Sequence, residues 1–123
     1  MSKERPILKG LLKEGTTDVE TFQNQTIRPI IKMQHALLIA SFVKYLQKRK
    51  IDFSRLTVSK KNQKIVTIYK TDHNHKNITL GLIIGHFTID EFAFYNTNAS
   101  ELNRRILQII SQRLIDSFPE ITA

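Results

Sequence analysis

The apolar segment from residue 30 to residue 46 constrains the fold more than any other feature of this chain. Within it, Ala36 to Val43 has seven apolar residues out of eight. When each residue is placed about 100° further around an α-helix, the apolar positions fall on nearly every side. A helix that is apolar all round belongs in a protein interior. The segment therefore predicts a central helix, enclosed on all sides by the rest of the chain.

Two segments outside this helix carry the signature of a helix start. Thr17 precedes Glu20, and Thr88 precedes Glu91, at the spacing of a capping box, in which each side chain bonds the other residue's backbone N–H. We therefore expect helices to begin just after both threonines.

Proline residues interrupt the first and the last of the predicted helices. Pro29 has no N–H to donate, so it predicts either a kink or a restart of the first helix with Thr26 as its cap. The last helix is expected to begin near Asn98 and to end before Pro119, leaving a short frayed end. Its apolar stripe is Leu102, Ile106, Ile109, Ile110 and Leu114.

The middle of the chain leaves two alternatives open. Ile65 to Tyr69 is rich in β-branched residues, and Ile78 to Ile84 is a suitable partner strand, which predicts a hairpin at about 63–87. The fold would then be α+β, with the hairpin packed between long N-terminal and C-terminal helices. However, Val58, Ile65 and Tyr69 recur at helical spacing, which predicts helices here instead.

Length and composition predict one domain of ordinary globular type. We expect a flexible N-terminal arm over 1–17, a single domain over 18–118 and a C-terminal tail over 119–123. The chain has no cysteine, which excludes disulfides and thiolate metal ligands. No apolar run approaches the roughly 20 residues that span a bilayer, so no membrane partner is expected and a cytoplasmic location is the default.

The net charge of +8 comes from one segment, Lys44 to Lys76, which has ten basic and two acidic residues. Such a segment attracts nucleic acid or an acidic partner, although a solvated, lysine-rich face is the simpler explanation. Within the segment, Tyr45, Phe53 and Tyr69 are the few aromatic residues available for base stacking. The candidate anion-binding or nucleic-acid-binding residues are Lys48, Arg49, Lys50, Lys60, Lys61, Lys64, Arg104 and Arg105.

The histidines are weak candidates for metal ligands. His73 and His75 are able to share a metal only if their segment is extended, and an exposed turn is the expected alternative. His86 is separated from Asp90 by the predicted start of a helix. His35, inside the apolar segment, is expected to be a hydrogen-bonded, neutral core residue. No catalytic residue, cofactor site or phosphate-binding loop is predicted.

Three stretches resemble a family of small proteins from Bacteroidetes that often carry the label glyoxalase. These stretches are Phe22 to Lys32, Gly85 to Phe92 and Leu102 to Arg105, and the likeness covers roughly residues 20 to 115. The resemblance implies a helical middle segment, so it favours an all-α fold, a small helical bundle around the central helix. Glyoxalases bind a divalent metal between βαβββ modules through His and Glu or Gln ligands. This chain lacks both features, so its residues do not support the label.

Three functions are therefore compatible with the sequence. The leading hypothesis is a non-enzymatic interaction or regulatory domain, with a homodimer as its candidate assembly, because apolar helical surface exceeds any chemical motif. One alternative is a nucleic-acid-associated protein that binds through Lys44 to Lys76. The other is a metal-dependent enzyme of the kind the glyoxalase label implies, with His73, His75 or His86 as ligands.

Overall fold

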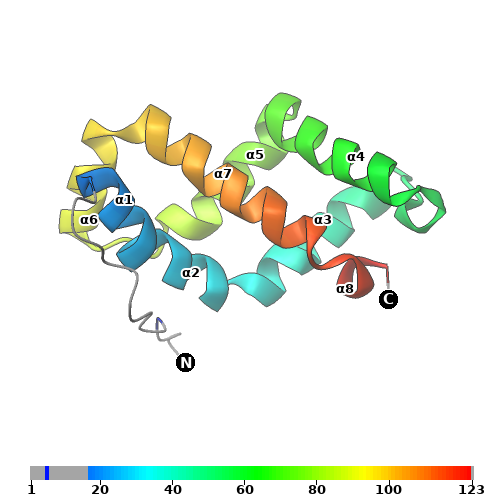
Figure 1. Cartoon of the computed structure of the whole chain (residues 1–123), viewed down its shortest axis with the longest axis horizontal. Coiled ribbons are helices and arrows are strands. Elements are labelled where there is room, and N and C mark those ends of the chain that lie inside the picture. Colours follow the sequence, from blue (N-terminus) through cyan, green and yellow to red (C-terminus); the bar gives the residue numbers. More distant parts are fainter. Residues whose placement is uncertain (1–4, 6–16, 123) are drawn as a thin grey trace.

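A computed structural model describes residue 5 and residues 17–122 of the chain (Figure 1). Apart from Arg5 and Thr17, the predicted arm at 1–17 lies outside these described residues. Every regular element in the described part is helical, which confirms the predicted all-α bundle. The elements are α1 (Asp18–Phe22), the π-helix η1 (Gln23–Ile27), α2 (Arg28–Met33), α3 (His35–Lys48), the 3₁₀-helix η2 (Phe53–Arg55), α4 (Val58–Thr71), α5 (His73–Ile84), α6 (Ile89–Thr97), α7 (Ala99–Ile115) and α8 (Phe118–Ile121).

The middle of the chain forms two helices, α4 and α5, which meet at Asp72, so the alternative hairpin at 63–87 is wrong. Thr57 caps α4 by accepting a hydrogen bond from the backbone N–H of Lys60 at 3.2 Å. Ile65, Ile68 and Tyr69 are buried along one side of α4. The helical repeat of buried positions therefore outweighs the β propensity of the individual residues.

Pro29 is accommodated without a break in the continuous helix formed by α1, η1 and α2, which we call the first helical rod. The turn before it, η1, is a π-helix, and the backbone of Phe22 and Arg28 on either side stays in the right-handed helical region. A π turn bonds each N–H one residue further back, which makes room for a ring that lacks an N–H. The prediction that Thr26 caps a new helix is wrong, because Thr26 lies buried inside this turn.

The predicted starts of α1 and α6 are confirmed. Thr17 Oγ1 accepts from the Glu20 N–H at 3.1 Å, and Thr88 and Glu91 form a complete capping box. Glu91 has further partners: Arg5 Nη1 donates to it at 2.7 Å, and the hydroxyl of Thr26 donates at 3.3 Å. Burial acts to raise the pKa of Glu91, but the hydrogen bonds from Arg5 and Thr88 outweigh burial and lower it.

The helix at the centre of the bundle is α7. Leu102, Ile106, Ile110 and Leu114 are all 0% exposed, as their spacing predicted. α7 crosses the molecule and packs against η1, α4, α5, α6 and α8 (Figure 1). The C-terminal segment that was expected to be a tail contains most of α8, because Ile121 finds a buried position in the same core.

The prediction that residues 30–46 form the enclosed central helix is wrong. Burial in α3 follows one stripe, formed by Leu38, Phe42 and Leu46. Ala36, Leu37 and Ala40 point away from this stripe and are exposed. Alanine has little apolar area to hide, so a helix side that is rich in it is able to remain outside the core.

Candidate functional site

The exposed side of α3 forms one wall of a groove, and α5 forms the other. The groove has a volume of about 630 Å³. Its apolar lining comes from Leu37 and Ala40 on α3 and from Ile78 and Leu82 on α5. Leu37 is 42% exposed and Ile78 is 51% exposed. We call this surface the α3–α5 groove, and it combines large exposed apolar side chains with a concave shape.

Basic residues of α3 and its C-cap line one end of the α3–α5 groove. These are Lys44, Lys48 and Arg49. The Arg49 guanidinium lies 5.2 Å from the centre of the Tyr45 ring, and its Nη2 donates to Asp72 Oδ2 at 3.0 Å. The two lysines are exposed and have no ion pair among the described residues. This end of the groove therefore presents unneutralised positive charge.

Asp72 organises the polar end of the groove. Its Oδ1 accepts from the backbone N–H of His75 at 3.1 Å, which caps α5, and its Oδ2 accepts from Tyr45 Oη at 2.7 Å. The hydrogen bond from Tyr45, followed by that from the His75 N–H, lowers the pKa of Asp72. Burial, followed by the same hydrogen bond, raises the pKa of Tyr45.

His75 lies beneath this end of the groove and belongs to the core. It is 5% exposed, its Nε2 lies 3.1 Å from Tyr69 Oη, and its ring centre lies 4.4 Å from that of Tyr45. Burial lowers the pKa of His75, while the nearby Asp72 opposes the shift. Burial also raises the pKa of Tyr69 to about 12. His75 is therefore a structural residue that fixes the α3–α5 contact.

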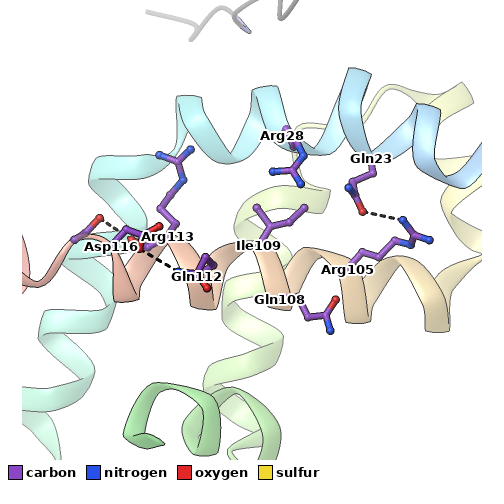
Figure 2. A pocket seen from close by; sticks show the side chains of 9 residues that line it. Gln23, Arg28, Arg105, Gln108, Ile109, Gln112, Arg113 and Asp116 are labelled. Atoms are coloured by element: carbon purple, nitrogen blue, oxygen red, sulfur yellow. Dashed lines mark hydrogen bonds between the residues drawn. The ribbon is translucent and has the colours of Figure 1, made fainter. Parts of the chain in front are cut away.

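A second hollow, of about 550 Å³, lies between the first helical rod and α7. Figure 2 shows Arg28 reaching down from α2 while Arg105 and Arg113 reach up from α7, with Ile109 between them. Asp116 is the one acidic residue among those lining it, and it accepts from Gln112 Nε2 at 3.0 Å. We call this hollow the arginine cleft.

Hydrogen bonds orient each of the three guanidiniums in the arginine cleft. Arg105 donates to Glu101 Oε1 at 2.9 Å and to Gln23 Oε1 at 3.0 Å, across the gap between α7 and η1 (Figure 2). Arg28 Nε donates to Asn24 Oδ1 at 3.0 Å. These contacts hold cationic groups from both walls in fixed positions.

The position of Arg113 depends on a relay of two further residues. Its Nη1 lies 3.2 Å from His35 Nδ1, and His35 Nε2 lies 2.8 Å from Glu120 Oε2. A guanidinium only donates, so Nδ1 accepts and Nε2 carries the proton that bonds Glu120. His35 is thus hydrogen-bonded as predicted, but it sits partly exposed at the start of α3 and not in the core.

The structure separates several candidates that the sequence grouped together. Lys48 and Arg49 line the α3–α5 groove, whereas Lys50, just beyond the C-cap of α3, has a left-handed conformation with φ of 57°. Lys60 and Lys64 lie on α4, and Lys61 Nζ lies 5.3 Å from the centre of the Phe118 ring.

Arg104 and Arg105 are neighbours in the chain but face different sides of α7. Arg105 lines the arginine cleft, while Arg104 lines another hollow beside Val66 on α4 and donates to Gln108 Oε1 at 3.2 Å.

The predicted metal candidates do not meet. His73 and His75 lie in the first turn of α5, two positions apart and so on different sides of the helix. The Nε2 of His86 lies 2.9 Å from Gln34 Nε2, which donates to it. Nowhere in the described residues do three or more His, Asp or Glu side chains gather closely enough to hold a metal ion.

Sequence reasoning missed Arg113, Gln23 and the exposed pair Leu37 and Ile78. Arg105 and Arg113 are eight positions apart, slightly more than two helical turns, so they share one broad side of α7, and this spacing was available in the sequence. The pairing of Gln23 with Arg105 was not available, because 82 positions separate them.

Comparison with known proteins found no matching protein-family model, no matching curated protein and no matching solved structure. Among the described helices, none combines the length and apolar character needed to cross a lipid bilayer.

Proposed function

We propose that this protein is a non-enzymatic interaction domain that docks an acidic, amphipathic helix of another protein in the α3–α5 groove. The observation that supports this function is the exposed apolar side of α3, which faces the exposed Ile78 of α5 across a concave surface. Large exposed apolar side chains gathered in a groove are typical of interaction sites.

The shape of the groove favours a helix as the occupant. Groove residues on α3 extend from Leu37 to Lys48, which corresponds to about 16 Å along the helix axis. Ala40 and Ser41 in the middle are small, so another backbone is able to approach closely. A partner helix of roughly three turns matches this length and would place apolar residues on Leu37 and Ile78.

The charge of the groove favours an acidic partner over a second copy of this chain. Lys44 and Lys48 are exposed at its basic end. A second copy joined through the same groove would supply the same lysines and no free carboxylate, because Asp72 is the one acidic residue that lines the groove and it is already bonded by Tyr45 and Arg49. Glutamate or aspartate on the flank of a partner helix would instead be attracted to them, which increases both association rate and specificity.

The proposal is tested with a synthetic helix of roughly 12 residues, with leucine at every third or fourth position and glutamate on both flanks. Fluorescence anisotropy should show saturable binding to the wild-type protein. Ile78→Ser should weaken it by roughly tenfold, because it removes one apolar wall of the groove. Ile89→Ser is the matched control, since Ile89 is 85% exposed and lies outside the groove.

Three results would contradict this function. The first is an absence of peptide binding to the wild-type protein. The second is equal loss of binding in Ile78→Ser and Ile89→Ser. The third is tighter binding of a peptide whose glutamates are replaced by lysine.

The other occupants are tested with the same two variants. Sedimentation showing a dimer that Ile78→Ser dissociates would assign the groove to a second copy. Salt-sensitive binding of an oligonucleotide that competes with the peptide would favour nucleic acid, the function predicted for Lys44 to Lys76.

A further inference from the structure

We propose that the arginine cleft is a binding site for a phosphate group of a small molecule, separate from the α3–α5 groove. Three guanidiniums from α2 and α7 line one concave surface with a single carboxylate, that of Asp116 (Figure 2). Arginine's planar fork bonds phosphate oxygens in pairs, and clusters of it are the usual protein device for holding this group.

The guanidiniums keep donors available for a ligand. Each guanidinium has five N–H groups. Arg28 and Arg113 each use one of them in their contacts with Asn24 and His35 within the described part of the protein. A phosphate that entered between α2 and α7 would find donors from both walls without breaking either contact.

The arginines are also oriented in advance, which lowers the entropy cost of binding. Gln23 and Glu101 hold Arg105, and the His35–Glu120 relay holds Arg113. The bonds of Arg105 to Gln23 and of Arg113 to His35 join different helices, so they fix the guanidiniums more firmly than a pair within one helix would. Orientation by fixed partners is what a site requires to bind one geometry of anion in preference to another.

The chemistry and size of the cleft favour phosphate over a single carboxylate. A phosphate monoester carries close to two negative charges at neutral pH and offers three terminal oxygens, which suits cations on opposing walls. A volume of about 550 Å³ falls within the range of small-molecule sites and leaves room for an organic group beside the phosphate. The half-buried Ile109 between the arginines provides an apolar contact for that group.

The test measures binding of inorganic phosphate and pyrophosphate by isothermal titration calorimetry, with sodium chloride added to keep ionic strength equal. We expect saturable binding of pyrophosphate, and weaker binding of phosphate. Arg113→Gln and Arg28→Gln should each weaken pyrophosphate binding by at least roughly tenfold, since each removes a charged donor. Arg28 is exposed, so its replacement leaves the core intact.

Arg104→Gln is the matched control, because it removes one positive charge from α7 on a side that does not line the cleft. Its pyrophosphate affinity should equal that of the wild type. Equal weakening in Arg104→Gln and Arg113→Gln would show that net charge alone binds the anion, and would overturn the site.

Three further results would overturn the assignment of the ligand. The first is a failure of both phosphate and pyrophosphate to bind at millimolar concentration. The second is tighter binding of the dicarboxylate succinate than of pyrophosphate. An oligonucleotide that binds in the cleft while both small phosphates fail would move the ligand to a nucleic-acid backbone. The Ile78→Ser variant should bind pyrophosphate normally, which keeps this test independent of the groove.

Discussion

The helices α7 and α3 have similar patterns of buried residues but differ in what covers their other side. Four aliphatic residues of α7 are completely buried, and its opposite side carries Arg104 and Gln108, which suit water. In α3 the buried stripe is accompanied by an exposed side that includes Leu37 and Ala40. The comparison teaches that a helix segment is able to contain more apolar residues than its core stripe needs, with the additional ones left exposed; in α3 these residues line the groove for which we propose docking.

The largest expected effect tests the difference in burial directly. Ile106→Ala in α7 should lower the free energy of unfolding by about 3–4 kcal/mol, because it removes buried methyl groups and leaves a cavity. Leu37→Ala in α3 should lower it by less than about 1 kcal/mol, since that side chain is partly in water. Urea unfolding followed by circular dichroism measures both. Similar losses in the two variants would show that the outer side of α3 is part of the core.

An intermediate effect should appear on acidification, because the α3–α5 contact contains a buried histidine and the aliphatic stripe of α7 does not. The pKa of His75 is lowered by burial from its ordinary value of 6.5, so below about pH 6.5 the unfolded chain binds more protons than the folded one. Stability should therefore decrease as the pH falls through this range. The groups facing His75 are Tyr45, Tyr69, Asp72 and Arg49.

The histidine responsible is identified with two glutamine variants. His75→Gln keeps an amide within reach of Tyr69, but glutamine does not bind a proton in this pH range. The urea midpoint of the variant should therefore change less between pH 7 and pH 5.5 than that of the wild type. His73→Gln alters an exposed neighbour and should retain the wild-type decrease. The lowered pKa of Asp72 adds a separate loss only below its ordinary value of 3.8. An unchanged pH dependence in His75→Gln would contradict the assignment.

The smallest effect concerns how the two helices end. α7 ends with Asp116 in a right-handed conformation, whereas α3 is followed by Lys50 with φ of 57°. The N–H of Ile51 donates to the Leu46 carbonyl at 2.9 Å across this residue, as in a Schellman motif, where glycine is preferred. Lys50→Gly should therefore raise the free energy of unfolding by about 1 kcal/mol.

Lys48→Gly is the matched control for this effect, because it removes the same charge from a residue whose backbone is helical. It should lower the free energy of unfolding by about 1 kcal/mol. A loss of stability in Lys50→Gly, measured by the urea midpoint, would show that the lysine side chain matters more than the backbone conformation.

Local signals were sufficient to predict much of the fold. The capping box of Thr88 and Glu91 and the stripe of α7 involve residues at most four positions apart, so the sequence displays them directly. The β-branched residues from Ile65 to Tyr69 left the middle segment ambiguous because their propensity and their spacing disagree. The packing of α4 on α7 decides in favour of a helix.

The two candidate sites were harder to predict because each depends on distant parts of the chain. The exposure of Leu37 depends on where α5 lies, and no local pattern encodes that distance. In the arginine cleft, Arg113 is positioned by His35, 78 positions earlier in the chain. The sequence did identify Arg105 and, in the groove, Lys48 and Arg49 as candidates, but it left out Lys44 and grouped the others with Arg104 and Lys61, which have other surroundings.

The π-helical turn η1 sets the angle by which the side chains of α1 are rotated about the helix axis relative to those of α2. Phe22, just before the turn, stacks on Phe94 with ring centres 4.8 Å apart, while Gln23, its first residue, reaches Arg105. Deleting one residue here would rotate the preceding segment by about 100° against the rest of the rod. Phe22 would then lose its aromatic neighbour while α2 kept its place. The π-helical turn therefore determines both contacts together: the stacking of Phe22 on Phe94 and the reach of Gln23 to Arg105 in the arginine cleft.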